Sequence, residues 1–246
     1  MGVSLNEYGQ PIGNVVDNWS IPDTPHQDII AGHYCSLARL DAATHAAELF
    51  HAFGTDPSGQ DWTYLPYGPF ADEEQFHTWI SEQSTKSDPL FFAVVDAQSR
   101  QAVGVASFLR IAPNAGTIEI GHIHFSPLLQ GKAAATEALY LMIKSVFALG
   151  YRRCEWKCNA LNDASRKAAL RLGFTFEGVF RQAGVVKGRN RDTAWYSILD
   201  REWPALSLAF DTWLSPGNFS GKGEQRLRLS ALTAKGQTGD PSNKGL

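Results

Sequence analysis

The amino-acid sequence predicts an α+β (mixed α/β) fold in which helices flank one central, mostly antiparallel mixed sheet. Two observations carry this prediction. Strand and helix patterns follow one another between residues 33 and 214 in the order β-α-α-β-β-β-α-β-α-β-β, with a last helix after them. Three strand candidates come in succession at 90–96, 102–110 and 117–125, and the short polar turn between the first two favours an antiparallel meander.

The first strand candidate, 33–40, leads into two helices. Asp41 stands at the N-cap position of the first helix, whose apolar residues recur at helical spacing. A polar and aromatic loop, 61–70, separates it from the second helix, where Asp72 and Gln75 form a capping-box pattern. Both helices therefore precede the meander in chain order.

The clearest helix follows Gln130. It has one apolar stripe, and Gly150 stands at the C′ position where a glycine ends many helices. Asn162 then caps a short helix between a strand at 154–160 and one at 174–180. A hairpin through KGRNRD leads to a strand at 193–200 and to the last helix, 201–214.

The two ends of the chain differ in composition from its middle. Residues 1–31 are rich in Pro, Gly, Asn and Asp without periodicity, which predicts an extended N-terminal arm. Residues 215–246 contain few large apolar side chains, and we expect a flexible C-terminal tail. The folded domain is accordingly predicted at 32–214.

Composition narrows the class of protein. With 246 residues, of which 43% are hydrophobic, the chain is long and apolar enough for one sizeable core. Cys35, Cys154 and Cys158 match no metal or redox spacing, so we expect free thiols in a reducing compartment. The first residues lack a basic and an apolar region, and no apolar run of about 18 residues occurs. We therefore expect a cytoplasmic protein with no membrane partner.

Charge is distributed unevenly along the chain. Residues 1–99 carry 2 basic and 14 acidic side chains, whereas residues 100–246 carry 20 basic and 11 acidic ones. Such asymmetry indicates a charged partner for at least one half. Ten basic residues gather in 151–191, but no DNA- or RNA-binding motif accompanies them, so nucleic acid is not the expected partner.

The junction at 126–138 is a candidate anion site. A strand ends there, a glycine and three alanines follow, and a long helix begins, so backbone N–H groups and the positive end of the helix dipole converge. An ordinary tight turn explains the same residues equally well. It is not a Walker A loop, because Lys132 is followed by Ala133 rather than Ser or Thr.

The run from Glu119 to Gly178 carries a family resemblance. Its segments PLLQGKAAATEA (127–138) and GYRRCEWKCNALNDASRKAALRLGFTFEG (150–178) resemble the acyl-CoA-binding core of the GNAT N-acetyltransferases, in the RimJ/RimL-like branch. The resemblance implies a single GNAT-like domain and acetyl-CoA, or another acyl-CoA, as co-substrate, with no metal. It also implies a loop that cradles the CoA pyrophosphate, formed here by Gln130, Gly131, Lys132, Ala133, Ala134 and Ala135.

Further cofactor contacts follow from the same resemblance. The strand before the loop is expected to splay, so that the backbone at Ile123 and Phe125 meets the pantetheine amides, and Asn162 resembles the asparagine beside the pantetheine arm. Asn162 can equally be an N-cap alone, or serve both purposes. The chain departs from the family at Ala133, where a glycine is expected. If that position needs a positive φ or a very close approach of the backbone to the cofactor, a Cβ is costly there and cofactor affinity suffers.

Attack of an amine on a thioester needs a base, and an acid for the departing thiolate. Ser165 occupies the position where RimL-like enzymes place a hydroxyl near the sulfur, although a serine in a first helical turn is often only a capping or solvated residue. The glutamate that the RimL-like enzymes place after the strand FTFEG is missing. Glu119 replaces it in our interpretation, at the spacing that the histone-acetylating branch uses, with an ion-paired rim carboxylate as the alternative.

The acceptor side is expected in the loop after the first helix. Trp62, Tyr64 and Tyr67 could form a pocket for a cationic amine or simply cover the sheet, and burial in the core is the favoured interpretation for Trp62. His122, two residues from His124 on one strand, is a further candidate for contact with the acceptor or for proton transfer, although a structural histidine with satisfied hydrogen bonds is the more common outcome for either. A metal site is not expected, since no third ligand has a diagnostic spacing.

These observations predict an acyl-CoA-dependent N-acyltransferase that acts by direct attack of a primary amine in a ternary complex. The acceptor would be a small molecule or a protein N-terminus, and the protein a monomer or homodimer. A CoA-binding sensor or scaffold with little catalysis is the alternative, motivated by Ala133 and the missing glutamate. The basic half would hold the anionic CoA, and the acidic half would attract the cationic acceptor.

Overall fold

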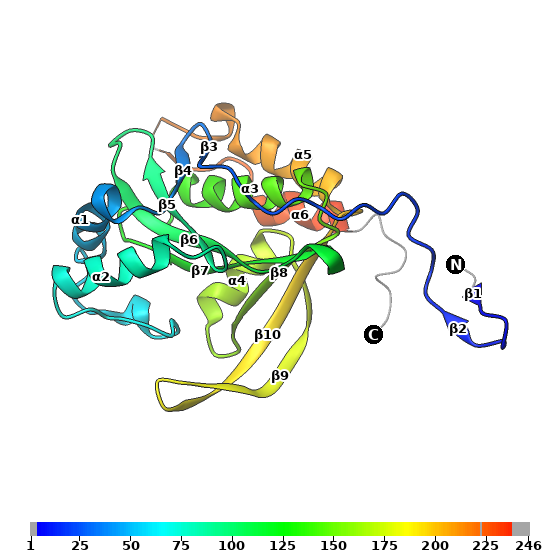
Figure 1. Ribbon diagram of the computed structural model, residues 1–246. Helices are drawn as coiled ribbons and strands as arrows, with labels where there is room; N and C mark the ends of the chain where they lie inside the picture. Colours follow the sequence, from blue (N-terminus) through cyan, green and yellow to red (C-terminus); the bar gives the residue numbers. More distant parts are fainter. Residues whose placement is uncertain (1–3, 222, 238–246) are drawn as a thin grey trace.

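A computed structural model describes residues 4–221 and 223–237 (Figure 1). The strands are β1 (Ser4–Leu5), β2 (Pro11–Ile12), β3 (Ile29–Ala31), β4 (Cys35–Arg39), β5 (Leu90–Asp96), β6 (Ala102–Ala112), β7 (Thr117–Phe125), β8 (Arg153–Asn159), β9 (Thr175–Val186) and β10 (Arg189–Leu199). The α-helices are α1 (Ala42–Phe53), α2 (Glu73–Ser84), α3 (Ala133–Ala148), α4 (Asp163–Arg171), α5 (Trp203–Leu214) and α6 (Leu229–Gln237).

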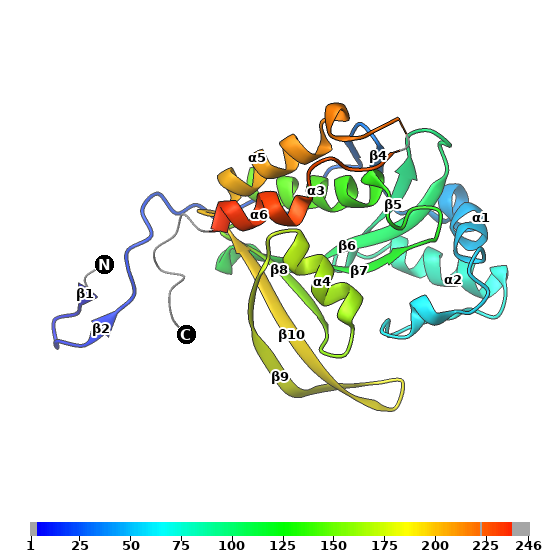
Figure 2. The same cartoon turned by 180° about the vertical axis from the view of Figure 1, so that it is seen from behind.

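Eight strands form one sheet in the order β3-β4-β5-β6-β7-β8-β10-β9. Every neighbouring pair is antiparallel except β7 and β8, which are parallel, so the predicted mixed sheet and its antiparallel meander are confirmed. Helices α1 and α2 lie over one face, and α3, α5 and α6 cover the other (Figure 1 and Figure 2).

The two covered faces explain the unbroken apolar sequence of β5. Successive side chains of a strand point to opposite faces, so Phe91 joins the core under α1 and α2 while Phe92 joins the core under α3. Both side chains are almost completely buried. A strand that is covered on both sides has no solvent face that needs polar residues.

The helix ends are where the sequence predicts them. The side chains of Asp41, Asp72 and Asn162 accept hydrogen bonds from the backbone N–H groups of Thr44, Gln75 and Ser165 and so cap α1, α2 and α4. Helix α3 ends at Ala148, and Gly150 takes a φ of +93° at its C′ position. The three capping side chains therefore satisfy backbone N–H groups in the first turns of these helices, which have no hydrogen-bond partner within the helix.

Both ends of the chain differ in detail from the sequence prediction. In the N-terminal arm, 1–31, β1 and β2 form a small ribbon that lies apart from the body in both views, and β3 joins the edge of the main sheet (Figure 1 and Figure 2). The tail expected at 215–246 contains α6, which packs on α5 through the buried Leu229. A few apolar side chains that pack on the core, Phe219, Leu229 and Leu232, order a segment whose average composition is polar. Residues 238–246 of that tail lie outside the described residues.

The last hairpin is longer than predicted. Strands β9 and β10 extend to a tight turn at Lys187 and Gly188, and the hairpin projects from the body of the molecule (Figure 1). Its tip returns to the loop after α1, because Lys187 Nζ donates a hydrogen bond to the Trp62 carbonyl at 2.9 Å. Within the described residues no helix is long and apolar enough to cross a membrane.

Candidate active site

A cavity opens where the two parallel strands separate. β7 and β8 pair from Thr117 opposite Arg153 to Ile120 opposite Trp156, and beyond this point they diverge. The cavity of about 500 Å³ at the divergence is lined by residues 121–123 of β7, residues 156–159 of β8, the start of α4 and the β9–β10 hairpin. The strand that was expected to splay, with Ile123 on it, therefore forms one wall.

A β-bulge shapes this wall. On β7, Gly121 faces Ser107 and His124 faces Val105, so His122 and Ile123 together face one residue of β6. His122 has a φ of +50°, a left-handed conformation that is strained for a residue with a side chain. A bulge leaves backbone groups outside the hydrogen-bonded ladder. Backbone at this wall is consequently free to contact a ligand, and strain of this kind often marks functional sites.

Glu119 lies at the base of the cavity and is 3% exposed. Its Oε2 atom accepts from two cations, Arg110 Nη1 at 2.6 Å and Lys157 Nζ at 2.9 Å. The alternative interpretation of Glu119 as an ion-paired carboxylate thus describes its contacts correctly, but the residue is buried within the cavity rather than on its rim. Both cations occupy the same oxygen, which leaves Oε1 as the atom that can accept a proton from an incoming amine.

The ion pairs continue along β8 toward the hairpin. Lys157 also binds Glu155 at 2.8 Å, and Arg153 joins Glu155 to Glu177 of β9. Burial acts to raise the pKa of Glu155, but Lys157 and Arg153 hold it below its ordinary value. The Lys157 ammonium also lies 3.7 Å from the centre of the Trp195 ring. Lys157 is therefore fixed in position by three partners.

The sequence analysis did not predict this network of ion pairs around Lys157 and Arg153. A visible indication exists in the alternation of β8, where buried Cys154, Trp156 and Cys158 separate the charged residues. Alternation shows that Arg153, Glu155 and Lys157 share one face. It does not show that Glu119, in register with Glu155, lies on that same face, because the parallel pairing of two strands is a tertiary feature.

Ser165 approaches the cavity from the other face of the sheet. It stands in the first turn of α4, and its Oγ accepts a hydrogen bond from Trp156 Nε1 at 3.0 Å. An indole nitrogen is a donor only, so Trp156 does not use the Ser165 hydroxyl hydrogen, whose neighbouring acceptor is the Cys158 sulfur. Asn162 caps the same helix, which confirms the N-cap, and it also lines the cavity, while its contact with the pantetheine arm stays a prediction.

The aromatic residues divide between core and cavity. Trp62 is 8% exposed and packs against Phe53, Phe70 and His124 in the core beneath α1 and α2. Tyr64 lines the cavity and donates a hydrogen bond to the Leu161 carbonyl. Tyr67 is packed into the same core as Trp62 and reaches the cavity only through His122, whose Nδ1 is 3.2 Å from its hydroxyl.

Burial changes the protonation of both histidines. Removal from water lowers the pKa of His122 to about 4, with nearby Arg110, Arg191 and Lys86 acting in the same direction. Burial alone lowers the pKa of His124 to about 4. Each imidazole is therefore neutral near pH 7 and is a weak proton acceptor, so neither is well suited to serve as the base.

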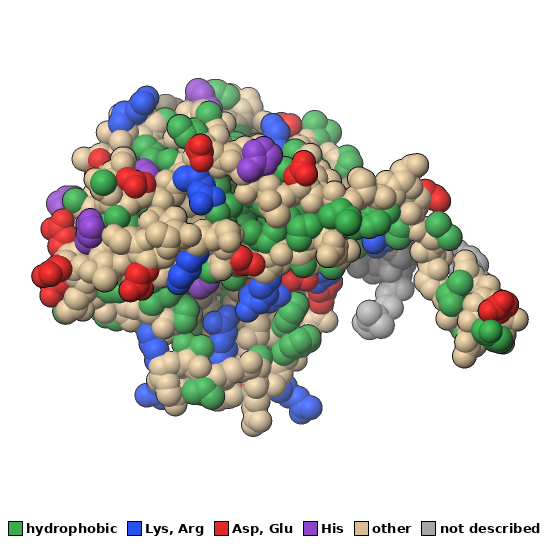
Figure 3. All heavy atoms as spheres, in the orientation of Figure 1, with side chains coloured by type: hydrophobic (Ala, Val, Ile, Leu, Met, Phe, Trp, Pro, Cys, Tyr) green, Lys and Arg blue, Asp and Glu red, His purple; other side chains and the backbone are tan. Residues whose placement is uncertain are grey.

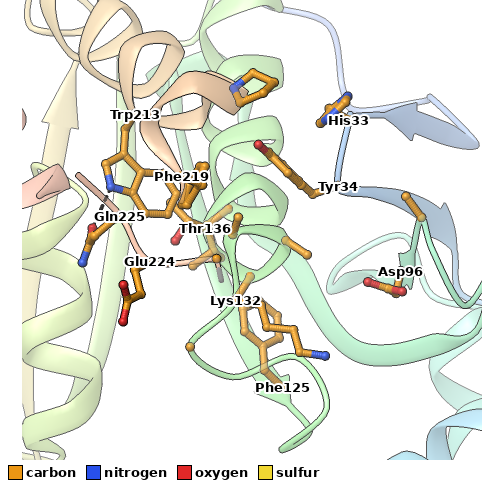
Figure 4. A pocket seen from close by; sticks show the side chains of 18 of the residues that line it. His33, Tyr34, Asp96, Phe125, Lys132, Thr136, Trp213, Phe219, Glu224 and Gln225 are labelled. Atoms are coloured by element: carbon orange, nitrogen blue, oxygen red, sulfur yellow. Dashed lines mark hydrogen bonds between the residues drawn. The ribbon is translucent and has the colours of Figure 1, made fainter. Parts of the chain in front are cut away.

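A second cavity, of about 1700 Å³, lies at the N-terminus of α3 and is lined in part by Phe125 and residues 131–135 (Figure 4). Gly131 has a φ of +74°, whereas Ala133 is the first residue of α3. Ala133 therefore needs no positive φ, because the left-handed position belongs to Gly131, and the effect of its Cβ on cofactor affinity stays a prediction. Gln130 secures the loop by donating to Asp61 at 2.8 Å and to the Phe125 carbonyl at 2.7 Å.

A comparison with protein families decides the identity of the fold. The model of the acetyltransferase (GNAT) domain matches residues 37–175, more than half of the chain. The chain belongs to the GNAT acetyltransferase family. The matched range contains α3, the divergence of β7 and β8, and the helix that carries Ser165.

Relatives of this GNAT protein carry acetyltransferase names. An uncharacterized N-acetyltransferase, p20, of Bacillus licheniformis is 28% identical over 161 residues, which cover 64% of this chain and 89% of the relative. Ribosomal-protein-serine acetyltransferase of Escherichia coli is 35% identical over 104 residues, covering 42% of this chain and 58% of the relative. The second match is consistent with the RimJ/RimL-like branch.

Solved structures of GNAT proteins share the architecture. A GCN5-related N-acetyltransferase of Brucella melitensis is 46% identical, with a TM-score of 0.87 over 89% of this chain and all of that one. A probable GNAT acetyltransferase of Chromobacterium violaceum is 45% identical, with a TM-score of 0.74 over 80% of this chain and 98% of that one. These likenesses identify an acetyltransferase fold, and acetyltransferase activity is the function they support.

Metal-ligating side chains do not cluster in the described part of this GNAT domain. Among the residues that the structure describes, no group of three His, Cys, Asp or Glu side chains could hold a metal ion. The three cysteines are buried and unpaired. Burial raises the pKa of Cys158 beside the cavity, although the neighbouring Ser165 hydroxyl lowers it in part, so Cys158 has little thiolate character for a covalent role.

Proposed function

We propose that this GNAT protein transfers an acetyl group from acetyl-CoA to a primary amine by direct attack in a ternary complex. The observation that carries the proposal is the divergence of β7 and β8, which opens one cavity to both faces of the sheet. Glu119 lies on the hairpin side of this opening, and Ser165 on the α3 side. The amine and the thioester can therefore meet from opposite sides.

The residues at the start of α3 are the proposed cradle of the CoA pyrophosphate. Lys132, Ala133, Ala134 and Ala135 stand at the positive end of the helix dipole, where side chains are small and backbone N–H groups lack helical partners. Gln130 and Gly131 shape the loop before them. Phe125 and Ile123 of β7, with Asn162 of α4, would follow the pantetheine arm from this cavity to the other one.

Two groups are positioned to move protons. Glu119 Oε1 would accept the proton that the attacking amine loses, while Arg110 and Lys157 hold Oε2. As the carbon–sulfur bond breaks, the Ser165 hydroxyl would donate to the departing sulfur, since its oxygen is already oriented by Trp156. The bond from nitrogen to the acyl carbon forms as the bond to sulfur breaks, so no acyl-enzyme is needed.

The acceptor is proposed to be a primary amine on a small molecule or a protein N-terminus. Asp61, Tyr64 and Glu119 provide two carboxylates and an aromatic ring for an amine in the acceptor cavity, whose lining also includes the cations Arg110, Lys157 and Arg191. The name of the Escherichia coli relative, a ribosomal-protein-serine acetyltransferase, favours testing peptides that begin with serine. The three buried thiols support the proposed cytoplasmic location, and a monomer or homodimer remains our expectation for assembly.

The test compares two active-site variants with two matched surface variants. Ser165→Ala and Glu119→Gln are expected to lower kcat by about 10²-fold or more, the usual contribution of a general acid or base, with less than a few-fold change in the Kd for CoA. Ser87→Ala and Glu82→Gln change exposed residues outside both cavities and should keep full activity. Thiol release from acetyl-CoA across a panel of amines and peptides measures kcat, and calorimetry measures Kd.

The outcome separates the proposal from its rivals. Full activity in a folded Ser165→Ala or Glu119→Gln variant would remove the assigned role. Tight CoA binding without transfer to any acceptor of the panel would instead favour the sensor or scaffold. The family match and the acetyltransferase relatives already favour catalysis.

A further inference from the structure

We propose that the C-terminal segment, described at 213–221 and 223–228, binds the 3′-phosphorylated adenosine end of CoA through these described residues. This segment lies beyond the match to the GNAT domain, which ends at residue 175. The inference deepens the proposed function and rests on it, because it concerns the same co-substrate. It adds a binding site that the start of α3 does not provide.

The segment forms one wall of the larger cavity. Trp213, Phe219, Gln225 and Arg226 line it on one side, and the first turn of α3 lines it on the other. In Figure 4 the rings of Trp213 and Phe219 lie beside Thr136, with Lys132 at the far end of the same turn. At about 1700 Å³ the cavity exceeds the roughly 300–1,000 Å³ of ordinary ligand sites and can take an extended ligand.

Hydrogen bonds hold this wall in place. The Asn218 side chain donates to the Trp213 carbonyl at 2.9 Å and accepts from the Leu227 N–H at 2.8 Å, closing the segment into a compact loop. Trp213 Nε1 donates to Gln225 Oε1 at 2.8 Å. Tyr34 donates to the Leu214 carbonyl and ties the segment to the chain just before β4. A wall that is already ordered requires little further ordering when a ligand binds.

The cavity carries cations that no carboxylate neutralises. Its lining includes four of them, against two carboxylates, Asp96 and Glu224. Within the described part of the chain, none of the four cations makes an ion pair; they are Lys132, Arg171, Arg226 and Arg228. Guanidinium groups bind phosphate through paired N–H donors, so the arginines suit a phosphate better than any neutral group.

The order of these groups along the cavity matches the chemistry of the ligand. The pyrophosphate of CoA would sit at the start of α3, and the 3′-phosphorylated ribose and its purine lie beyond the pyrophosphate on the side away from the thioester. Across the cavity from Lys132 lies the half-buried ring of Phe219, backed by the buried ring of Trp213 (Figure 4). Arg226 and Arg228 line the same cavity. An aromatic ring packs well against a purine, and a guanidinium binds the phosphate next to it.

The two exposed arginines permit a test that leaves the core untouched. Calorimetry would measure the Kd of CoA and of 3′-dephospho-CoA, which lacks only the 3′-phosphate, for the full chain and for the Arg226→Gln/Arg228→Gln variant. The unaltered chain is expected to bind CoA at least tenfold more tightly than 3′-dephospho-CoA. The variant should lose most of this preference while its Kd for 3′-dephospho-CoA stays within about twofold, because only the contact to the missing phosphate is removed.

The matched control is Arg189→Gln, which removes an exposed arginine at the tip of the β9–β10 hairpin, outside this cavity. It should keep the tenfold preference. Equal affinities of the unaltered chain for CoA and 3′-dephospho-CoA, or an unchanged preference in the double variant, would overturn the inference while acetyl transfer still proceeded. Absence of any CoA binding would overturn the proposed function together with it, so the two failures are distinguishable.

Discussion

The charged and aromatic residues at the centre of the sheet depend on neighbours that are distant in sequence. Glu119 is held by Arg110 and Lys157, and Ser165 is oriented by Trp156. His124 is enclosed between Phe53, stacked at 4.0 Å, and the edge of Trp62, and its Nδ1 has no hydrogen-bond partner. A buried polar atom without a partner costs stability, so this histidine is a sensitive point of the core.

The substitution His124→Phe is expected to flatten the pH dependence of stability. Burial lowers the pKa of His124 to about 4, so the folded state keeps it neutral while the unfolded state protonates it near pH 6.5. Stability from this group is present above pH 6.5 and is lost as the pH falls toward 4. The variant should therefore lose about 1–2 kcal/mol less than the unaltered chain between pH 7 and pH 5.

Urea denaturation at both pH values measures this difference. A phenyl ring fits the stacked site and has no unpartnered nitrogen, so the variant should be at least as stable as the unaltered chain at pH 7. Identical loss of stability in the two proteins on acidification would show that His124 does not titrate as its surroundings indicate.

Helix α3 positions two parts of the structure through one side chain. Its first turn forms the proposed anion cradle, and Glu137, one turn further on, is buried and accepts N–H bonds at 2.6–2.8 Å from His33, Tyr34 and Cys35. These bonds fix the turn between β3 and β4 against α3. Gly32 is required in this turn, because a Cβ there would lie 2.6 Å from the Glu137 carboxylate.

Replacement of this carboxylate by an amide is expected to destabilise the protein. Glu137→Gln replaces one acceptor oxygen by an NH₂ group, which is a donor. A buried backbone N–H group would then point at another donor and lose its hydrogen bond. Loss of charge-assisted bonds predicts a decrease of about 2–3 kcal/mol in the free energy of unfolding. Chemical denaturation measures it, with Glu82→Gln on the exposed face of α2 as the control. A Glu137→Gln protein as stable as this control would refute the anchoring role.

On the scale of the whole molecule, the two cavities are proposed to bind different substrates, CoA in the larger one and the amine acceptor in the smaller one. The view in Figure 3 shows acidic side chains gathered over α1 and α2 and basic ones on the β9–β10 hairpin and beside the sheet. The larger cavity has an excess of cations. The other cavity is lined by Asp61 and Glu119 but also by Arg110, Lys157 and Arg191, so the acidic surface that would attract a cation is the one over α1 and α2. A field of this kind would attract an anionic thioester and a cationic amine to different places.

Ionic strength tests this arrangement. As salt rises from about 0.02 to 0.3 M, the Debye length falls below about 10 Å, and the attraction of an exposed acidic surface for a cation is screened. The apparent KM for a cationic peptide acceptor should therefore rise several-fold, while the KM for an acceptor of the same length with no net charge stays within about twofold. Equal responses of the two acceptors would contradict electrostatic attraction. Both series need saturating acetyl-CoA, because its own binding depends on salt.

The sequence by itself determined the features that depend on neighbours along the chain. Helix caps at Asp41, Asp72 and Asn162, the meander, and the loop before α3 follow from local hydrogen bonding and from periodicity. The quoted motifs also carried the family resemblance, because the loop and its helix are contiguous. Local rules suffice wherever the interacting groups are a few residues apart.

Only the tertiary structure decided which distant residues meet. The parallel pairing of β7 with β8 places Glu119 beside Lys157, and packing on α5 turns part of an apparently polar tail into α6 and a cavity wall. Position along the chain does not specify such contacts, since they are set by strand register and by which apolar face each segment can bury. The charge asymmetry was visible in the sequence, but only the fold assigned its cations to a cavity.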